Sequence, residues 1–188
     1  MKELFELARK AIKEGYVAEN HSEKKGVFVT LYTYPGKELR GCIGFPLPIY
    51  PLRKAVCLAA RAAAYEDPRF EPLKEEELDE VILEISILSE PKKADIRQIE
   101  IGRHGVIVKY GPFSGLLLPQ VAVEEKLNPD QFVKLACLKA GLPPEYSDKV
   151  DVYVFEAEIY AEKEPNGNIV RRLYDKERKN YIEEEIKE

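Results

Sequence analysis

The hydrophobic positions at the start of the chain repeat with the period of an α-helix. Leu4, Ala8, Ala11 and Ile12 fall on one stripe, and lysines and glutamates occupy most of the opposite side. This pattern predicts an amphipathic helix over residues 2–18 that packs on a sheet.

Three later segments have the pattern of β-strands. Residues 26–34, GVFVTLYTY, are β-branched and aromatic on both faces, which predicts a central or nearly central strand. Pro35 and Gly36 predict a turn, after which residues 39–45, LRGCIGF, return antiparallel to the first strand. Residues 81–88, VILEISIL, predict a buried strand.

Between these strands the pattern becomes helical again. Three prolines exclude regular structure up to Pro51, where proline suits a first helical turn, and small residues at helical spacing follow as far as Ala63. They predict a helix that can approach a neighbour closely. Asp67 and Pro68 end it or cap the next turn, and the acidic run LKEEELDE predicts a short helical turn.

The second half of the chain predicts a hairpin, a helix and a long strand. The hairpin covers residues 105–119, with its turn at 110–114. Asn128, followed by Pro129 and by Gln131 three positions later, predicts a capped helix that stops at Gly141. The alternating residues 150–162 predict a strand, which turns at PNGN into a last strand at 169–173.

Antiparallel strands with interspersed helices predict the α+β class, with a mainly antiparallel sheet flanked by helices. The 188 residues, of which 45% are hydrophobic, suit one domain, and no repeat, linker or composition break divides them. We expect a single domain over residues 1–174. The charged residues 175–188 predict a solvated tail or a surface helix.

Charge and composition narrow the functional classes. The net charge of −5 comes from intermixed acidic and basic residues, which does not favour nonspecific nucleic-acid binding, although a local basic patch stays open. The N-terminus is too charged for a signal peptide, and no apolar run is long enough to span a membrane, so we expect a cytoplasmic protein. The abundance of glutamate and lysine resembles that of hyperthermophile proteins.

The cysteine and histidine content argues against a metal site or a disulfide framework. Cys42, Cys57 and Cys137 are odd in number and irregularly spaced, which favours reduced thiols. His21 falls in a polar loop and His104 beside two glycines in a turn, so zinc has little support. The sequence indicates no cofactor.

The candidate chemistry lies in the segment LRGCIGF. On a strand, Arg40, Cys42 and Gly44 share one face, and we expect Leu39 and Ile43 to face the core. A nearby guanidinium lowers the pKa of a thiol, so Cys42 is a candidate nucleophile or redox centre that Arg40 would tune. The glycines at 41 and 44 would admit a ligand or a bulge. Alternatively, Cys42 is a core residue and the glycines make room for the alanine-rich helix.

Three further residues are candidates for ligand binding. Asp67 and Arg69 form an ion pair beside a turn or, with Arg69 facing an anion, line a binding site. Gln120, after Pro119, either binds a ligand through its amide or caps a helix.

The hexapeptide LRGCIG at 39–44 is the hallmark of the AMMECR domain family, and four other segments also resemble that family. They are FVTL at 28–31, DPRFEPL at 67–73, LLLPQVA at 116–122 and LKAGL at 138–142. Together these segments span most of the chain, in the order expected for the family.

The resemblance implies two intertwined lobes, the second smaller, with a cleft between them that contains the hexapeptide, and it implies no established activity. It also implies association with a Memo-type dioxygenase-like protein and with radical SAM enzymes. Only the motif positions Arg40, Gly41, Cys42 and Gly44 carry over.

Three functions follow as hypotheses. The first is a component of a protein- or RNA-modification or redox system, with Cys42 as its reactive thiol. The second is a non-catalytic module that recognises an anionic or modified ligand through Arg40 and Arg69. The third is a scaffold for protein interaction, in which the hexapeptide is structural.

Overall fold

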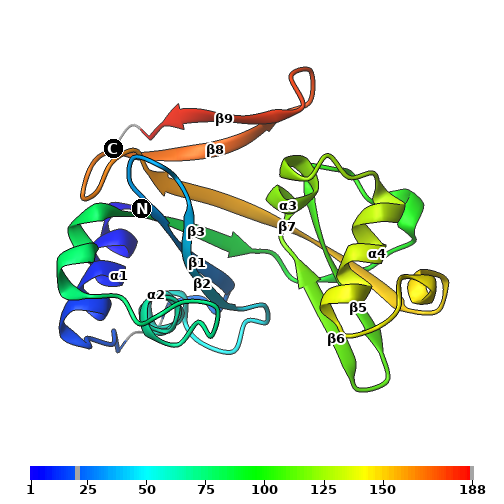
Figure 1. The fold of residues 1–188 in the computed structure, drawn as a ribbon, viewed down its shortest axis with the longest axis horizontal. Helices are drawn as coiled ribbons and strands as arrows, with labels where there is room; N and C mark the ends of the chain where they lie inside the picture. Colours follow the sequence, from blue (N-terminus) through cyan, green and yellow to red (C-terminus); the bar gives the residue numbers. More distant parts are fainter. Residues whose placement is uncertain (20–21, 187–188) are drawn as a thin grey trace. The chain divides into compact units, whose positions relative to one another are not determined.

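The structure is a computed structural model that describes residues 1–19 and 22–186, and it divides into two compact units (Figure 1). The first unit comprises Met1–Leu88, Glu158–Arg172 and the end of the chain from Glu183. The smaller second unit comprises Ser89–Ala157 and Leu173–Ile182. His21, which we predicted in an exposed loop, lies outside the described residues.

The first unit is built on antiparallel strands. Its strand order is β2–β1–β3–β7, and β8 pairs with β7 on the side away from β3. Because β7 begins in the second unit and ends in the first, the chain returns to the first unit after it has built most of the second. The bounds are β1 (Gly26–Thr33), β2 (Leu39–Phe45), β3 (Val81–Leu88), β7 (Asp151–Glu162) and β8 (Ile169–Asp175).

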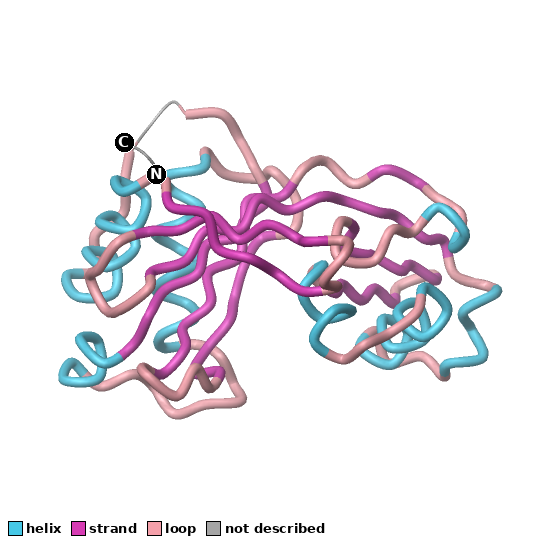
Figure 2. The backbone as a smooth tube through the Cα atoms, turned by 90° about the horizontal axis from the view of Figure 1, so that it is seen from above, coloured by secondary structure: helices cyan, strands magenta, loops and turns pink. Residues whose placement is uncertain are grey.

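Helices α1 (Lys2–Glu14) and α2 (Leu52–Tyr65) cover one face of these strands, as Figure 2 also shows for the helices and strands of this unit. The inward positions of β1 are Val27, Val29 and Leu31, all fully buried against the helices. The short helix η1 (Glu75–Glu80) precedes β3. Helix α1 ends at Glu14, earlier than predicted, because Gly15 takes the left-handed conformation at φ 68° and stops it.

Two ion pairs with nearly buried carboxylates tie the returning segment of the first unit to its N-terminal part. On the helix side, Arg9 Nη2 lies 2.7 Å from a carboxylate oxygen of Glu162. On the opposite face, Arg172 pairs with Glu84. The side chains of Glu162 and Glu84 are each only 3% exposed. Removal of the partner would therefore leave a buried and uncompensated charge on each carboxylate.

The second unit packs helices on the hairpin of β5 and β6. Asn128 caps α4 through a hydrogen bond from the amide of Gln131, and the side chain of Gln131 accepts one from the amide of Asn128, as predicted. The apolar faces of α3 and α4 meet β5 around the fully buried Phe132. The elements are β4 (Lys92–Lys93), η2 (Ile96–Gln98), β5 (His104–Tyr110), β6 (Phe113–Leu117), α3 (Pro119–Glu124), α4 (Pro129–Lys139) and η3 (Pro144–Asp148).

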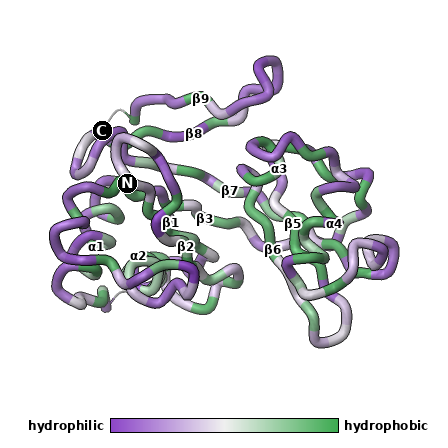
Figure 3. Tube along the Cα trace, in the orientation of Figure 1, coloured by the Kyte–Doolittle hydropathy of each residue, from purple (hydrophilic) through white to green (hydrophobic). Residues whose placement is uncertain are grey.

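The charged end of the chain contains a strand where we predicted a solvated tail or a surface helix. Strand β9 (Asn180–Glu185) pairs with β8, and the turn that joins them is hydrophilic (Figure 3). Most residues of β9 are exposed, so pairing with β8, and not burial, selects the strand.

The α+β prediction is confirmed: antiparallel strands are flanked by helices in each unit. None of the described helices has the length and hydrophobicity of a membrane span.

Candidate functional site

A β-bulge shapes the start of strand β2. Leu31 pairs with Gly41 and Tyr32 pairs with Leu39, so Arg40 is an extra residue between two paired positions. Because of this extra residue, the side chains before Gly41 point to the opposite face of the sheet from the one that simple alternation predicts. Leu39 is therefore exposed, and the prediction that it faces the core is wrong, whereas Ile43 packs against the core as predicted.

The two glycines of the hexapeptide allow close contacts within the protein. A Cβ atom at Gly41 would lie 2.1 Å from the carbonyl oxygen of Ala63 in α2. A Cβ atom at Gly44 would lie 2.2 Å from the carbonyl oxygen of Val27 and 2.5 Å from the ring of Phe28. The protein itself thus occupies the room that these glycines provide, with α2 against Gly41 and β1 against Gly44.

Cys42 lies on the sheet face opposite the helices and is partly exposed. Thr30, directly opposite on β1, donates a hydrogen bond from Oγ1 to the Cys42 sulfur over 3.2 Å. The amide of Cys42 points away from β1, so the two residues form a non-hydrogen-bonded pair, in which side chains come closest. A donated hydrogen bond favours the thiolate form of such a sulfur.

Asp67 secures the free edge of β2 at Cys42. Its Oδ2 accepts the amide hydrogen of Cys42 at 2.9 Å, and its two oxygens together accept three hydrogen bonds from Arg69. Asp67 is only 5% exposed. The hydrogen bonds from Arg69, above all, lower the pKa of Asp67 from 3.8 to about 2. The predicted ion pair is confirmed.

The guanidinium that accompanies Cys42 belongs to Arg69. The pKa of Arg69 is raised, first by its hydrogen bond to Asp67 and, in smaller part, by the nearby charge of Cys42. Arg40 is bound elsewhere, since Nε and Nη2 hydrogen bond to the carboxylate of Glu77 and Nη1 to the carbonyl oxygen of Glu71. The bulge places Arg40 within hydrogen-bond distance of Glu77, and this hydrogen bond lowers the pKa of Glu77.

Polar side chains lie side by side across the sheet, from Cys42 on β2 through Thr30 on β1 to Glu84 on β3, which pairs with Arg172. Thr30 and Glu84 are nearly buried. Sequence reasoning missed both residues. The alternation of Val27, Val29 and Leu31 places Thr30 on the opposite face, but only the register of β1 with β2 and β3 shows its partners.

The other sulfur atoms differ sharply from that of Cys42. Cys57 and Cys137 are fully buried, and burial raises the pKa of each thiol. Neither therefore has the environment of a reactive thiol.

The remaining candidates lie in the second unit. Gln120 is buried in the first turn of α3. His104 begins β5, and its Nδ1 accepts a hydrogen bond from the amide of Glu100. The part of the chain that the structure describes contains no cluster of three histidine, cysteine or acidic side chains that could hold a metal.

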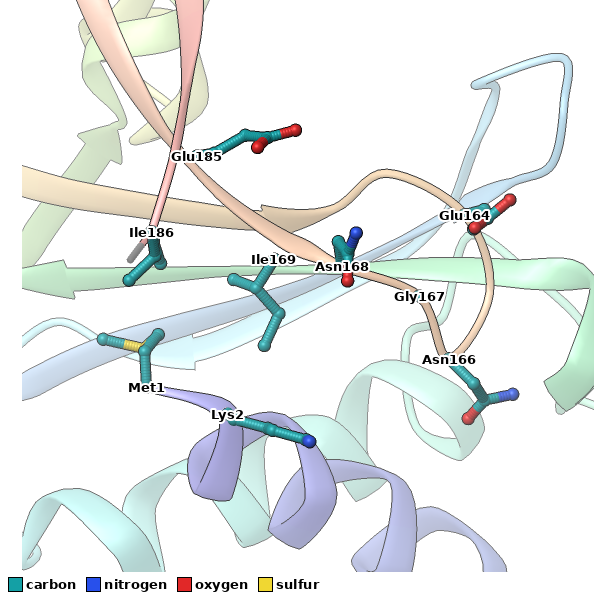
Figure 4. A pocket seen from close by; sticks show the side chains of 9 residues that line it. All are labelled: Met1, Lys2, Glu164, Asn166, Gly167, Asn168, Ile169, Glu185 and Ile186. Atoms are coloured by element: carbon teal, nitrogen blue, oxygen red, sulfur yellow. The ribbon is translucent and has the colours of Figure 1, made fainter. Parts of the chain in front are cut away.

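An open pocket of about 440 Å³ lies in the first unit between the start of α1 and the turn before β8 (Figure 4). Neither the hexapeptide nor its hydrogen-bond partners line it. Its lining consists of Met1, Lys2, Glu164, Asn166, Gly167, Asn168, Ile169, Glu185 and Ile186.

Comparison with known proteins gives consistent matches over most of the chain. The AMMECR1 family model matches residues 5–160. Protein MK0488 of Methanopyrus kandleri is 48% identical over 189 residues, covering 90% of this chain and 91% of its own. A protein of Aquifex aeolicus is 50% identical over 161 residues, covering 81% of this chain and 83% of its own. Both relatives come from thermophiles, in keeping with the composition.

A solved structure also matches. The crystal structure of uncharacterized protein PH0010 from Pyrococcus horikoshii superposes with a TM-score of 0.86 at 44% identity, covering 92% of this chain and 96% of that one.

Proposed function

The chain belongs to the AMMECR1 family, and from this premise we propose that it is a component of a protein- or RNA-modification or redox system with Cys42 as its reactive thiol. One observation carries the proposal. Of the three cysteines, Cys42 alone is partly exposed, and its sulfur accepts a hydrogen bond from Thr30. A reactive thiol needs both access and a stabilised thiolate.

The proposed chemistry is nucleophilic displacement, in which the Cys42 thiolate forms a bond to an electrophilic atom and the leaving group departs with the electron pair of the broken bond. The redox form is oxidation by a peroxide, which transfers one oxygen atom to the sulfur to give a sulfenic acid and departs as water or an alcohol. Thr30 and Arg69 would stabilise the charge on sulfur. As partners we propose a Memo-type dioxygenase-like protein and a radical SAM enzyme, which rest on the family resemblance, and as location the cytoplasm.

The alternative of an anion-binding module has less support. It relied on Arg40 and Arg69, and each guanidinium is already hydrogen bonded to a carboxylate, of Glu77 and Asp67 respectively. An anionic ligand would have to compete with these ion pairs. We therefore place the thiol function first.

The test is the ionisation of Cys42 in a variant that carries Cys57→Ala and Cys137→Ala. The rate of alkylation by iodoacetamide would be measured against pH, with the same variant also carrying Cys42→Ala as the blank. We expect an apparent pKa below the ordinary thiol value of about 8.5. A thiol that stays protonated above that value would overturn the proposal and direct the search to binding.

A further inference from the structure

We infer that Asp67 and Arg69, and not Arg40, are the positioning residues that set the ionisation of Cys42. The inference rests on the proposed function and adds how this site is controlled. Neither residue needs to touch a substrate, because both act through the cysteine.

Cys42 and Arg69 bind the same oxygen of Asp67. Oδ2 of Asp67 accepts the amide hydrogen of Cys42 at 2.9 Å and a guanidinium hydrogen from Nη2 of Arg69 at 2.8 Å. The backbone of Cys42 and the guanidinium of Arg69 are thus held on one oxygen of a buried side chain. Their separation is fixed by two short hydrogen bonds, without a flexible linker.

Asp67 also fixes the orientation of the Arg69 guanidinium. Nε and the backbone amide of Arg69 bind the other oxygen, Oδ1, so Asp67 holds the guanidinium along one edge. Among the described residues, none is bonded to Nη1, and the side chain of Arg69 is 55% exposed. One edge of the cation therefore stays open to solvent beside the hexapeptide.

The charged side chains on and beside the strand of Cys42 form ion pairs. On the neighbouring strand β1, the uncharged side chain of Thr30 lies opposite Cys42. On β3, the next strand, the carboxylate of Glu84 pairs with Arg172. On its own strand, Arg40 pairs with Glu77. Asp67, which binds the amide of Cys42, pairs with Arg69. Removal of either member would leave one unbalanced charge next to Cys42.

The two removals act in opposite directions. Arg69→Met leaves the buried carboxylate of Asp67 beside the sulfur, so the thiolate becomes less favourable and the pKa of Cys42 rises. Asp67→Asn leaves a cation, so the pKa of Cys42 falls. A change of one pKa unit alters the alkylation rate about tenfold at a pH below the pKa. Damage to the fold alone would move both variants the same way.

The chain contains its own control for this experiment. Asp95 and Arg97 have the same spacing, and the amide, Nε and Nη2 of Arg97 bind Asp95 in the same pattern. This pair is exposed and makes no hydrogen bond to a cysteine. Arg97→Met and Asp95→Asn should leave the alkylation of Cys42 unchanged.

The experiment measures alkylation of Cys42 against pH in the chain that carries Cys57→Ala and Cys137→Ala. At a pH one unit below the apparent pKa, we expect Arg69→Met to slow alkylation about tenfold and Asp67→Asn to accelerate it, with Arg69→Lys close to the parent. Circular dichroism checks the fold. If the Asp67→Asn variant does not fold, the comparison of Arg69→Met with Arg69→Lys still tests the inference, because the side chain of Arg69 is half exposed.

Two results would overturn the inference while leaving the proposed function intact. The first is a reactive Cys42 whose apparent pKa does not change in the Arg69 variants. The second is a shift of the Cys42 pKa in the same direction in Arg69→Met and in Asp67→Asn. An unreactive Cys42 in the parent would overturn the proposed function itself, so the two failures are distinguishable.

Discussion

At the residue scale, the hexapeptide is shaped by what lies against its glycines. Gly41 and Gly44 have no positive φ, so their backbone conformations are open to any residue. What excludes a side chain is the backbone of α2 and of β1, which cannot move aside without shifting an element. The glycines are therefore required by packing.

Gly41→Ala should destabilise the protein, because its Cβ atom would overlap a backbone oxygen of α2. We expect a loss of about 1–3 kcal/mol in the free energy of unfolding, as for other overpacked sites. Gly36→Ala is the matched control, since its Cβ atom would meet its nearest neighbour at an ordinary 3.6 Å. Urea denaturation measures both, and equal losses would contradict the packing account.

Asp67 should make stability depend on acid. Its folded-state pKa of about 2 lies below its ordinary 3.8, so its contribution is complete above about pH 4 and is lost as the pH falls towards 2. The shift corresponds to about 2 kcal/mol. The free energy of unfolding is measured by denaturation at pH 4 and at pH 2. Between these two pH values the parent should lose more stability than Asp67→Asn, and the difference should equal this amount. Parallel curves would contradict the prediction.

At the element scale, the capping of α4 could be predicted from sequence because every partner is local. Asn128, Pro129 and Gln131 need only their own helix to form the cap. The bulge in β2 could not, because an extra residue becomes visible only against the partner strand. The same holds for β9, whose charged sequence pairs with β8 without a hydrophobic pattern.

The bulge also decides the role of Arg40. Sequence alternation placed its guanidinium beside Cys42, whereas the extra residue directs it to Glu77 and to the carbonyl of Glu71. The ion pair of Asp67 with Arg69 is local, and the sequence predicted it. Its contact with the amide of Cys42, 25 positions away, depends on how β2 and the segment after α2 meet.

Arg40→Met should act on stability and leave the thiol unchanged. It removes three hydrogen bonds that join β2 to η1 and to the segment before it, two of them to the partly exposed Glu77. We expect a loss of about 1–2 kcal/mol in the free energy of unfolding. The pH dependence of Cys42 alkylation should match that of the parent. A raised pKa of Cys42 would show that Arg40 tunes the thiol after all.

At the scale of the whole molecule, the first unit is assembled from segments that are distant in sequence. Arg9 and Glu162 are 153 positions apart, and Glu84 and Arg172 are 88 positions apart. Both pairs join the segment after Glu158 to the N-terminal part of the chain. This interleaving explains why no composition break marks a boundary in the sequence.

Arg9→Met should be strongly destabilising. It leaves the carboxylate of Glu162 buried and without its cation, which costs about 3–5 kcal/mol in comparable cases. It also removes hydrogen bonds to the carbonyl oxygens of Leu78 and Val81. The double variant Arg9→Met with Glu162→Leu should be less destabilised than Arg9→Met alone, by thermal or urea denaturation. A larger loss in the double variant would contradict the burial argument.

The interleaved path has a consequence for the nascent chain. When the ribosome has made β3, Glu84 has no Arg172 to pair with and β3 lacks β7 as its neighbour. At about 5–20 residues per second, the 88 positions between Glu84 and Arg172 take roughly 4–18 seconds to translate. Until β7, which ends at Glu162, has been made, one edge of β3 is unpaired, which exposes the newborn protein to chaperones and to aggregation. Most of the second unit, Ser89–Ala157, is synthesised during the same interval.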